Sequence, residues 1–558
     1  MNKTFDFVIV GSGGGSMCAA LAMRAAGNSV LILEKTDLVG GTTAISGGVM
    51  WIPDNRFMRQ EGVEDSQEQA IGYLDAVVGD HDEAPGASRE RRMAYVEQAP
   101  KMIDFLVNQG IRLRRIPSWP DYYDAAGESV PGRTVVSELF DINQLGEWKS
   151  RLRPGFLPLP ANLDEAMELP NFKRSWQAKK VLARIIWRTI TSKLKGKHLT
   201  TAGQALQGQM LHAAIAAGVE IEVNADVKQL LLEGKRVTGV VVEHEGSDLQ
   251  ITARSGVLIN AGGFSRNQRM LDQYIPGTST QWTNTAEGDT GEMIEEAVRI
   301  GAAIAQMDER IGNPVALPPG EAPPTPVIVH GDMAKPHSIV VDQNGERYMR
   351  ESHSYMEVGK AMLKHNQQAP AVPSWLLMDS QYLETHMLAG TMPGSKKPKA
   401  WQEQRFLRSG QTLEALAKEC DIDPAKLQAT VERFNGFVRN GRDEDFQRGD
   451  HVYSQWLGDA LNQHSAALGA IERGPFYAIQ VYPGDVSTFG GLVTDAQARV
   501  LREDGSIIAG LYATGTSTAS VMGSASPGAG ASIGPSFTWG YVAANHAIRD
   551  ALDASTPV

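Results

Sequence analysis

The first 40 residues alternate between short apolar runs and polar or glycine-rich breaks. Val8-Ile9-Val10 is a continuous run of β-branched residues, which is typical of a strand buried on both faces of a parallel sheet. The residues from Met17 to Ala26 predict a helix, and those from Ser29 to Leu33 predict a second strand. The chain is therefore expected to begin with a unit of strand, helix and strand.

Glycine fills the break between the first strand and the helix, at residues 11–16. Gly11 suits a tight turn, Gly13 lets the backbone approach a pyrophosphate, and the helix N-terminus supplies free N–H groups to it. Ser16 takes the third place of G-x-G-x-x-G with a small side chain, and Glu34 ends the second strand, where it can accept hydrogen bonds from a ribose hydroxyl. The pattern favours a dinucleotide site over a bare glycine-rich turn. The predicted site includes Gly11, Gly13, Gly14, Ser16, Glu34 and Lys35.

A second glycine-rich loop follows in EKTDLVGGTTAISGGVMWIP at 34–53, where two glycine pairs are separated by small hydroxylated residues. This loop resembles the extended fingerprint of flavoproteins in the fumarate reductase and 3-ketosteroid dehydrogenase superfamily, in which it folds over the FAD pyrophosphate. Further matches at 224–231, 257–267, 510–520 and 527–544 extend the resemblance over nearly the whole chain. The resemblance implies these further cofactor-binding residues: Gly40, Gly41, Thr42, Thr43, Ser46, Gly47, Gly48, Val227, Ala261, Gly262, Gly515, Ser532 and Ile533.

The resemblance also implies how FAD is held. In the superfamily, a helix N-terminus around Ser532-Ile533-Gly534 points at the pyrimidine edge of the flavin ring, where its dipole would stabilise negative charge on the reduced flavin. A flexible loop is the alternative for the glycine-rich segment, but a helix-like run follows it. Some relatives attach FAD through a histidine in the second glycine loop. Gly41 stands at that place, so we expect non-covalent FAD.

The order of these motifs predicts an α/β fold, in which a Rossmann-type FAD-binding domain carries an inserted α+β cap domain for the substrate. With 558 residues the chain exceeds the ~250–300 residues at which single cores stop growing, so two domains are expected. We expect the FAD-binding domain at 1–282 and 486–558, and the cap at 283–485. An amphipathic helix is predicted after Gly288-Asp289, and a strand at 338–342.

The candidate catalytic tyrosines come from two segments. Fumarate reductases carry a glutamate and, after three more residues, an arginine that acts as proton donor. This chain has Glu351 and then Tyr355, and 3-ketosteroid Δ1-dehydrogenases use a tyrosine at this position as catalytic base. The run SWPDYYDAAG at 118–127 resembles their Y-P-D-Y segment and supplies Tyr122, with Tyr123 second, as the assisting hydroxyl. Core packing is the alternative role for each tyrosine, because aromatic side chains bury large areas.

The expected ketone-binding run departs from the family pattern. In the steroid enzymes a tyrosine hydroxyl and a backbone N–H from a Y-P-G-x-G run polarise the ketone, and the corresponding run here extends from Ser526 to Gly530. Gly530 can supply the N–H, whereas the Ser526 hydroxyl reaches several ångströms less than that of a tyrosine. Either the ketone sits differently, or a water intervenes, or another hydroxyl such as that of Tyr482 serves.

These residues favour FAD-dependent α,β-dehydrogenation of a cyclic ketone, with a tyrosine as base and hydride transfer to flavin N5. A 3-ketosteroid Δ1-dehydrogenase-like reaction comes first, and a dehydrogenase for smaller cyclohexanone-type ketones is the alternative. A fumarate-reductase-like alkene reductase is weakened by the missing arginine, and a non-catalytic FAD-binding sensor is weakened by the retained hydroxyls. The reaction needs an electron acceptor that the sequence does not identify.

Composition limits the partners and the location. The net charge of −12 argues against a general nucleic-acid binder, and two cysteines, Cys18 and Cys420, suit a cytoplasmic protein without a cysteine metal site. We expect no metal and no transmembrane segment. The stretch 173–197 holds nine Lys or Arg, no acid and two tryptophans. It suits peripheral contact with a membrane surface, although a solvated helix or a lid over the flavin site is the simpler interpretation.

Overall fold

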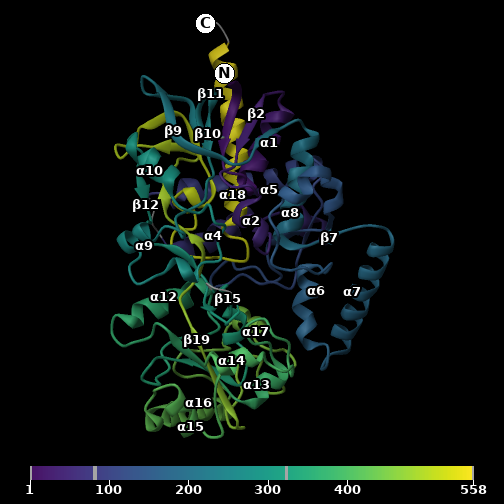
Figure 1. Ribbon diagram of the computed structural model, residues 1–558, viewed down its shortest axis with the longest axis vertical. Coiled ribbons are helices and arrows are strands. Elements are labelled where there is room, and N and C mark those ends of the chain that lie inside the picture. The colour runs from purple at the N-terminus through teal and green to yellow at the C-terminus, as the bar shows by residue number, and fades with distance from the viewer. Residues whose placement is uncertain (1–2, 80–83, 245, 321–323, 556–558) are drawn as a thin grey trace.

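The computed structural model describes residues 3–79, 84–244, 246–320 and 324–555. Figure 1 shows an upper part built from both ends of the chain and a lower part built from its middle. The N- and C-termini lie together at the top, because the last segment returns to the part that the first segment began. This arrangement agrees with the predicted insertion of a cap into an α/β domain.

A mostly parallel sheet forms the centre of the upper part. Within the described residues it has eight strands, ordered β22, β23, β11, β1, β2 and β8, with β10 and β9 continuing from β11. β1 lies between β2 and β11 and is parallel to both, which explains its continuous apolar sequence. The strands are β1 (Lys3–Val10), β2 (Val30–Leu33), β8 (Glu220–Glu222), β9 (Ala225–Glu233), β10 (Arg236–His244), β11 (Ser247–Ile259), β22 (Arg499–Leu501) and β23 (Ile507–Ala513). Both predicted strands are confirmed.

The two faces of β1 are buried in different cores. Phe7 and Ile9 pack with helix α1 (Gly14–Ala25) and with α18 (Ile533–Ser555), whereas Val8 and Val10 pack in the core that holds α9 (Gln268–Tyr274) and α10 (Glu292–Arg299). α1 confirms the helix predicted after the glycines, and α10 confirms the amphipathic helix predicted after Asp289. Because side chains alternate between the two faces of a strand, the sheet packs against one layer of helices on each face.

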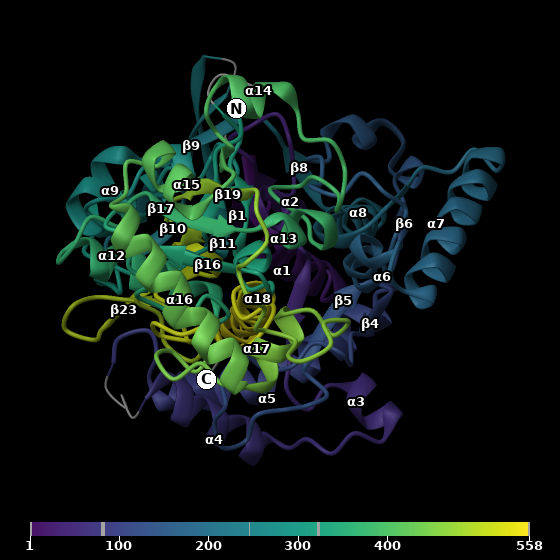
Figure 2. The same cartoon turned by 90° about the horizontal axis from the view of Figure 1, so that it is seen from below.

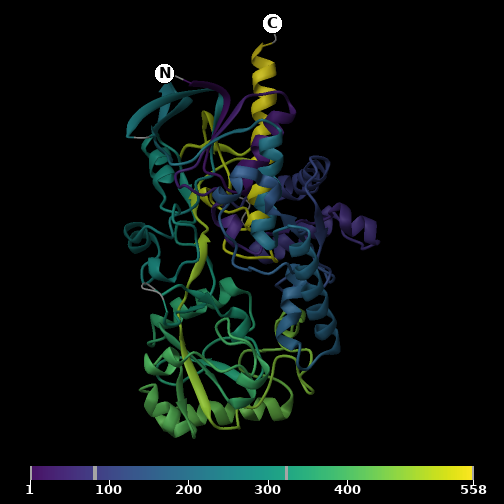
Figure 3. The same ribbon diagram turned by 45° about the vertical axis from the view of Figure 1, so that its right-hand side comes forward.

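The C-terminal helix α18 closes the core of the upper part. It packs against α1, and Figure 3 shows it as the long helix that ends at the C-terminus. The contact is close, because a Cβ atom on Gly540 of α18 would lie 2.2 Å from the carbonyl oxygen of Gly15. α18 begins at Ile533, which confirms the helical run predicted after the second glycine burst.

The lower part is built on an antiparallel sheet in the order β16, β17, β19 and β18. One face packs against α15 and α16, and the other packs against α12, α13 and α14 (Figures 1 and 2). Strand β16 confirms the strand predicted at 338–342. The elements are β16 (Ser338–Val341), β17 (Ser374–Met378), β18 (Arg408–Gly410), β19 (Phe476–Val481), α11 (His330–Met333), α12 (Tyr355–Asn366), α13 (Ser380–Thr385), α14 (Lys399–Glu403), α15 (Leu413–Glu419), α16 (Pro424–Asn440) and α17 (Val452–Leu457).

Short ladders connect the two parts. The chain pairs with itself through β12 (Ile304–Ala305) and β21 (Gly491–Leu492), and through β13 (Arg310–Gly312) and β20 (Asp485–Thr488). A third ladder joins β14 (Val315–Ala316) to β15 (Val327–Ile328). The outgoing and returning segments thus lie side by side, and the expected domain limits at 282 and 485 fall next to them.

The remaining elements surround the upper part. Helix α7 stands out from the body with α6 beside it (Figure 1), and no helix in the described ranges combines the length and apolar character needed to cross a membrane. The elements are α2 (Gly41–Ile45), β3 (Val49–Trp51), α3 (Arg56–Glu61), α4 (Gln67–Val78), α5 (Arg89–Asn108), β4 (Leu113–Arg115), β5 (Thr134–Ser137), β6 (Phe140–Asp141), α6 (Leu163–Glu168), α7 (Trp176–Leu194), β7 (Leu199–Thr200) and α8 (Ala202–Ala216), with short 3₁₀ helices η1 (Ile142–Arg151), η2 (Leu169–Asn171), η3 (Thr280–Trp282) and η4 (Gly515–Ser517).

Candidate active site

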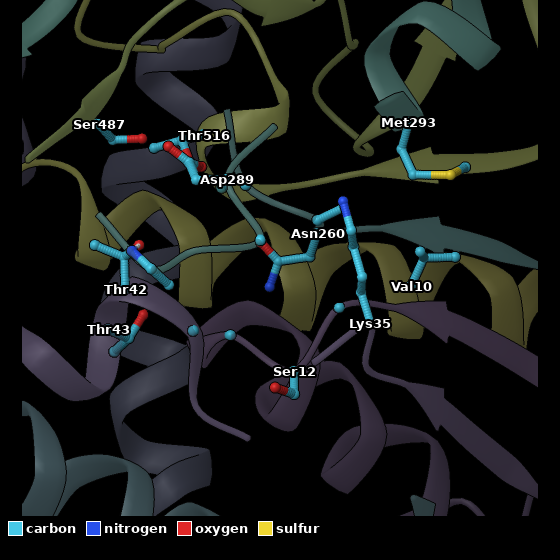
Figure 4. Close-up of a pocket in the computed structure, with 18 of the residues that line it drawn as sticks. Val10, Ser12, Lys35, Thr42, Thr43, Asn260, Asp289, Met293, Ser487 and Thr516 are labelled. Carbon is cyan, nitrogen blue, oxygen red and sulfur yellow. Dashed lines mark hydrogen bonds between the residues drawn. The ribbon is translucent and has the colours of Figure 1, made fainter. Parts of the chain in front are cut away.

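A pocket opens where β1 ends and α1 begins, and both chain ends line it (Figure 4). Gly11 has a φ of +92°, and a Cβ atom there would lie 2.2 Å from the Asn260 carbonyl oxygen, so only glycine fits this turn. In Figure 4, Ser12, Thr42 and Thr43 lie toward one side of the pocket, with Asp289 and Ser487 opposite.

Most of the predicted cofactor residues line this pocket. They are Gly11, Gly13, Gly14, Glu34, Lys35, Gly41, Thr42, Thr43, Ser46, Val227, Ala261, Gly262, Gly515, Ser532 and Ile533. They come from seven separate stretches of the chain. The structure therefore brings the two glycine bursts of the sequence together around one pocket.

Four predicted residues lie behind the pocket instead of lining it. Ser16 is buried, with its Oγ 2.9 Å from the side-chain amide of Asn260. The N–H of Gly40 donates to Ser12 Oγ at 2.9 Å. Gly48 has a φ of +62° and packs against the first turn of α8, and Gly47 also faces away from the pocket. The small size of these residues permits close backbone packing of the loops that line the pocket, and their contact with the cofactor stays a prediction.

Glu34 lines the pocket but also holds the glycine loop. One carboxylate oxygen accepts hydrogen bonds from the backbone N–H of Ser12 at 3.1 Å and from its hydroxyl. The other accepts from the backbone N–H and the hydroxyl of Thr36, each at 2.9 Å. A carboxylate has about four acceptor positions, so these bonds use its capacity within the protein. The predicted ribose contact must share an acceptor with them.

Two buried polar atoms in the pocket wall lack hydrogen-bond partners among the described residues, as expected of a site that binds a polar ligand. Asp289 Oδ2 and Ser487 Oγ have no hydrogen-bond partner among the described residues, although both residues line the pocket. Burial raises the pKa of Asp289 to about 6, despite the hydrogen bond that its Oδ1 accepts from the N–H of Gly263. Buried polar groups are normally satisfied, so these atoms fit a hydroxylated, hydrogen-bonding cofactor.

A second cluster gathers the predicted catalytic residues. The Ser526 hydroxyl donates to the Tyr355 hydroxyl at 3.1 Å, and the ring centroids of Tyr122 and Tyr355 are 5.6 Å apart at a steep angle. Tyr453 of α17, which the sequence did not single out, packs at a tilt against Tyr122, with ring centroids 4.3 Å apart. Gly530 lies four residues beyond Ser526, and Ser532 and Ile533 already line the dinucleotide pocket. One short segment therefore links the hydroxyl cluster to the pocket.

Buried ion pairs fix the loop that carries Tyr122. Asp121 accepts hydrogen bonds from Trp51 Nε1 at 2.8 Å and from Arg133 Nη1 at 2.7 Å. Arg133 also pairs with Asp65, at 2.6 Å. Desolvation raises the pKa of Asp121 to about 6, and Arg133 opposes that rise. Breaking such a buried pair leaves an uncompensated charge, so the loop is held in one place.

Glu351 positions Tyr355 without touching it. The Glu351 carboxylate pairs with Arg347 at 2.7 Å and lies 3.3 Å from Arg448, and all three side chains are buried. These arginines hold its pKa below the usual range against the effect of desolvation. Tyr355 then starts helix α12, which Ser354 caps by accepting the N–H of Glu357 at 3.5 Å. Glu351 is therefore an anchor for the turn that presents Tyr355.

The tyrosines of this cluster, of which Tyr355 is only partly buried, differ in their pKa values. Desolvation raises the pKa values of Tyr122 and Tyr453 well above their ordinary value. The pKa of Tyr355 is raised by the same cause, but hydroxyl groups of Ser526 and Tyr122 lower it in turn. Of these three tyrosines, Tyr355 is therefore the one whose pKa is raised least.

The other hydroxyls considered from sequence have different contacts. Tyr123 lies beside the cluster, where its hydroxyl accepts the N–H of Ser526 at 3.4 Å and donates to Glu357 at 3.3 Å. Tyr482 packs at a tilt against Trp282, with ring centroids 5.2 Å apart, and its hydroxyl donates to Gln480 at 3.1 Å. These contacts of Tyr482 do not include Ser526 or Tyr355.

Comparison with known proteins identifies the family. A family model described as an FAD binding domain matches residues 6–533. The chain belongs to this FAD-binding family. A 3-oxosteroid 1-dehydrogenase of Mycolicibacterium smegmatis is 36% identical over 97% of this chain and 97% of its own length. A 4-oxocyclohexanecarboxylate 2-dehydrogenase of Sinomonas cyclohexanicum is 34% identical over 97% of this chain and 92% of its own length.

A solved structure of the family has the same fold. The crystal structure of 3-ketosteroid delta1-dehydrogenase from Sterolibacterium denitrificans, in complex with 1,4-androstadiene-3,17-dione, matches with a TM-score of 0.91. It is 36% identical in sequence, and the match covers 98% of this chain and 100% of that chain. The predicted fold class, an FAD-binding α/β domain with an inserted cap, is confirmed. The chain is an FAD-dependent oxidoreductase that acts on CH–CH groups.

The residues of this flavoenzyme that line the pocket fit FAD. The glycine loop and the N-terminus of α1 would hold the pyrophosphate, and Glu34 and Val227 lie where the adenosine part is expected. At the other end, Ser532 and Ile533 stand at the N-terminus of α18. No metal is needed for this arrangement, and the described ranges contain no group of three or more His, Cys, Asp or Glu placed to hold one.

Sequence reasoning missed several residues of the FAD pocket. Arg153 reaches the pocket from a distant segment and donates to the Thr36 hydroxyl at 2.9 Å, and no motif marks it. Asn260 lay inside the matched run 257–267, and Asp289 lay beside the predicted amphipathic helix, so both were within reach of the motif argument. Further lining residues that were not predicted are Ser12, Asp226, Ala286, Met293, Ile311, Val486, Ser487, Thr516 and Ser536.

Proposed function

We propose that this enzyme desaturates a cyclic ketone between its α and β carbons, with a 3-ketosteroid Δ1-dehydrogenase-like reaction as the best-supported form. The observation that carries the proposal is the hydrogen-bonded pair of the partly buried Tyr355 and the buried Ser526, which lies beside Tyr122 and one short segment away from the FAD pocket. The 36% identity to a 3-oxosteroid 1-dehydrogenase over nearly the full length supports the same substrate class.

The protein side of the reaction is proton removal. The ionised Tyr355 hydroxyl takes the proton from the α carbon, and the electron pair of that C–H bond forms the new C=C bond. The chemistry that bound FAD supplies is acceptance of the hydride that leaves the β carbon. The α proton is acidic only while the ketone oxygen is polarised, and we assign that role to the N–H of Gly530. Two hydrogens leave the substrate, one as a proton and one as a hydride.

The N–H of Gly530 is free for this role. It donates no hydrogen bond within the described ranges, whereas the Gly530 carbonyl accepts from Trp51 at 3.1 Å and from Gly534 at 2.9 Å. Its φ is +94°, and a Cβ atom would lie 2.4 Å from the Val49 carbonyl oxygen. The backbone is therefore held rigidly with one donor to spare, as polarisation of a ketone requires.

A smaller cyclic ketone is a second candidate substrate. Trp456 of α17 stacks on Trp119 with ring centroids 5.1 Å apart, and Tyr453 packs at a tilt against Tyr122 with centroids 4.3 Å apart, so aromatic rings fill much of the space beside Tyr355. The 34% identical relative from Sinomonas cyclohexanicum is named for a cyclohexane ketone. A dicarboxylate is disfavoured, because the described neighbours in contact with Tyr355 are Tyr122, His330 and Ser526, and burial lowers the pKa of His330 to about 4.

Flavin bleaching tests the reaction class. The FAD-loaded protein is mixed without oxygen with 3-ketosteroids, with substituted cyclohexanones and with succinate, and the loss of yellow colour is followed. We expect rapid bleaching by saturated ketones and none by succinate. Dithionite-reduced protein is then offered fumarate in the same cuvette. Rapid reoxidation by fumarate, together with no bleaching by any ketone, would move the function to an alkene reductase.

We also propose that FAD is held without a covalent bond and that the domain limits lie near 282 and 485. Among the described residues that line the pocket, none is a histidine, cysteine or tyrosine, the side chains that form such bonds. Acid precipitation should therefore leave all flavin in the supernatant, and coloured precipitate would contradict the proposal. Limited proteolysis of the FAD-loaded protein should cut near the proposed limits.

We propose that helix α7 contacts an anionic membrane surface at the periphery of the bilayer. Trp176, Trp187 and Leu194 are 70, 69 and 83% exposed, and their spacing of three and two helical turns sets them on one face. Lys179 and Lys180 lie close to that face, Lys193 lies to its side in the last turn, and all three are exposed. Apolar anchors flanked by lysine are typical of helices that lie in the membrane interface. No residue of α7 is among those that line the FAD pocket, so the lid interpretation is not supported.

Vesicle sedimentation tests this contact. The full chain should sediment with vesicles of equal parts phosphatidylglycerol and phosphatidylcholine, and much less with phosphatidylcholine alone. Replacing Trp176 and Trp187 by serine should abolish sedimentation. The control Ile507→Ser removes an exposed apolar side chain of the central sheet, 41% exposed, and should bind as the parent does. Equal binding by the tryptophan variant would make α7 a solvated helix.

A further inference from the structure

Ser526 occupies a place where its hydroxyl is already committed. The side chain is buried, its Oγ donates to the Tyr355 hydroxyl at 3.1 Å, and its N–H donates to the Tyr123 hydroxyl at 3.4 Å. A serine hydroxyl carries one proton and can donate one hydrogen bond at a time. While it donates to Tyr355, it has no proton left for a substrate ketone.

We propose that Ser526 is a positioning residue that activates Tyr355, and that it does not polarise the ketone. This inference rests on the proposed desaturation and assigns to Ser526 a part that the Y-P-G-x-G pattern gives to no residue. The hydroxyl group that pattern would aim at the substrate is here aimed at the base. Polarisation of the ketone is then left to the N–H of Gly530.

A donor at this place favours the ionised base. A hydrogen bond to the phenol oxygen is strengthened when that oxygen carries negative charge, so it stabilises the phenolate. The pKa of Tyr355 is raised by desolvation, and the Ser526 and Tyr122 hydroxyls are the two groups that lower it. Desolvation and the neighbouring Tyr453 and Tyr355 raise the pKa of Tyr122 well above its ordinary value, although a hydrogen bond with Trp119 lowers it in part. Without Ser526, the proton of Tyr355 would be harder to remove.

Among the described residues, no charged group is one of those that lower the pKa of Tyr355. His330 of α11 lies 5.9 Å from the Tyr355 ring, and burial lowers the pKa values of His330 to about 4 and of His353 to about 3, so both rings are neutral at pH 7. Glu357 and Lys360 lie along α12 with their charged atoms 3.9 Å apart. The further titratable neighbours are Tyr453 of α17, Tyr123 and Asp124 of the 118–127 loop, Arg350 before α12, and His451, which pairs with Asp124.

The loop around Ser526 is rigid enough to aim the hydroxyl. The Pro527 carbonyl accepts the Tyr73 hydroxyl at 2.7 Å and the N–H of Tyr122 at 2.9 Å. The same carbonyl therefore ties Ser526 to the loop that carries Tyr122. Both donors to Tyr355 are held by one small network, and their geometry does not depend on a bound substrate.

The first test needs no substrate. The ultraviolet absorbance of phenolate is measured against pH in the FAD-loaded parent and in Ser526→Ala. From each titration, that of the same protein carrying Tyr355→Phe is subtracted, so that only the Tyr355 signal remains. We expect Ser526→Ala to move this titration up by about one to two pH units, the shift that corresponds to one hydrogen bond to a charged group. Ser526→Thr, which keeps the hydroxyl, should restore the parent value. An unchanged titration would overturn the proposal, whatever the substrate.

The second test separates the base from the ketone. Flavin bleaching by a saturated ketone is measured against pH, and the dissociation constant of an unreactive dienone is measured by flavin absorbance. In Ser526→Ala the rise of the rate with pH should move up by the same amount as the phenolate titration, while the dienone constant stays within about twofold. The control Ser524→Ala lies in the same loop with an exposed side chain and should match the parent. Weaker binding of the dienone with an unchanged pH profile would show that Ser526 binds the ketone and would overturn the proposal. An equal loss of bleaching rate at every pH would show that Ser526 has only a structural role and would also overturn it. If no ketone bleaches even the parent, the proposed function fails, and the phenolate titration still decides the role of Ser526.

Discussion

Replacing Glu34 by glutamine tests whether one carboxylate both holds the glycine loop and binds FAD. The carboxylate accepts from two groups of Ser12 and two of Thr36 before any cofactor contact is made. In Glu34→Gln, whichever way the amide turns, its NH₂ faces one of these donor pairs. At least one backbone N–H then loses its acceptor, and the other bonds lose their charge.

The expected loss appears in two measurements. A hydrogen bond to a charged group contributes ~1.5–3 kcal/mol, so the free energy of unfolding of the FAD-free protein should fall by ~2 kcal/mol. The loop that lines the pocket is then less ordered, and the Kd for FAD should rise by ~10-fold or more. Urea unfolding of the FAD-free protein gives the first value, and flavin fluorescence on dilution gives the second.

A matched control separates this effect from loss of charge near the pocket. Glu292 also lines the pocket and pairs with Lys35, but its side chain is 53% exposed. Exposed pairs contribute ~0–1 kcal/mol, so Glu292→Gln should change both values little. If Glu34→Gln alters FAD affinity and leaves the stability of the FAD-free protein unchanged, the carboxylate acts only on the ribose. If neither value changes, the reasoning about this residue is wrong.

Two further substitutions test the packing and the electrostatics of the pocket. A Cβ atom on Gly14 would lie 1.9 Å from the Phe537 ring, so Gly14→Ala should force α1 and α18 apart. We expect the variant to lose ~1–3 kcal/mol of stability in thermal unfolding and most of its bound FAD in a flavin assay. The control Gly72→Ala in α4, with open space around it, should be neutral or stabilising, and equal losses in both variants would contradict this reasoning. Because the pKa of Asp289 is raised to about 6, ionisation of this carboxyl lowers the stability of the protein as pH rises from about 4 to 6. In urea unfolding of the FAD-free protein, Asp289→Asn should therefore be more stable than the parent by up to ~3 kcal/mol at pH 7 and by little at pH 4. A difference in stability that does not change with pH would refute the assignment.

The elements with local sequence signals were predictable. The residues from Val8 to Val10 lie in β1, and α1 begins within a few residues of the predicted helix, because burial on both faces and the glycine turn leave marks in consecutive residues. The glycine pair at 40–41 was also found, since a positive φ at Gly40 and Gly41 restricts the choice of residue.

Contacts between distant segments were not predictable in the same way. Arg153 reaches the FAD pocket from a segment with no motif, and its place depends on the pairing of that segment with the second glycine loop. Tyr453 reaches Tyr122 only because the cap places α17 over the 118–127 loop. The sequence placed Ser526 in the site, but it could not show that the Ser526 hydroxyl donates to Tyr355, because that contact depends on where Tyr355 lies in the folded chain.

The Tyr355→Phe variant tests the central claim most directly. The change removes one oxygen and keeps the ring that packs against Tyr122 and His330, so FAD content and thermal stability should match those of the parent. Anaerobic flavin bleaching by a saturated cyclic ketone should fall by at least the ~10²-fold that loss of a general base costs, and the residual rate should no longer rise with pH. Bleaching at the parent rate, with the parent's dependence on pH, would make Tyr355 a packing residue and contradict the proposed desaturation mechanism.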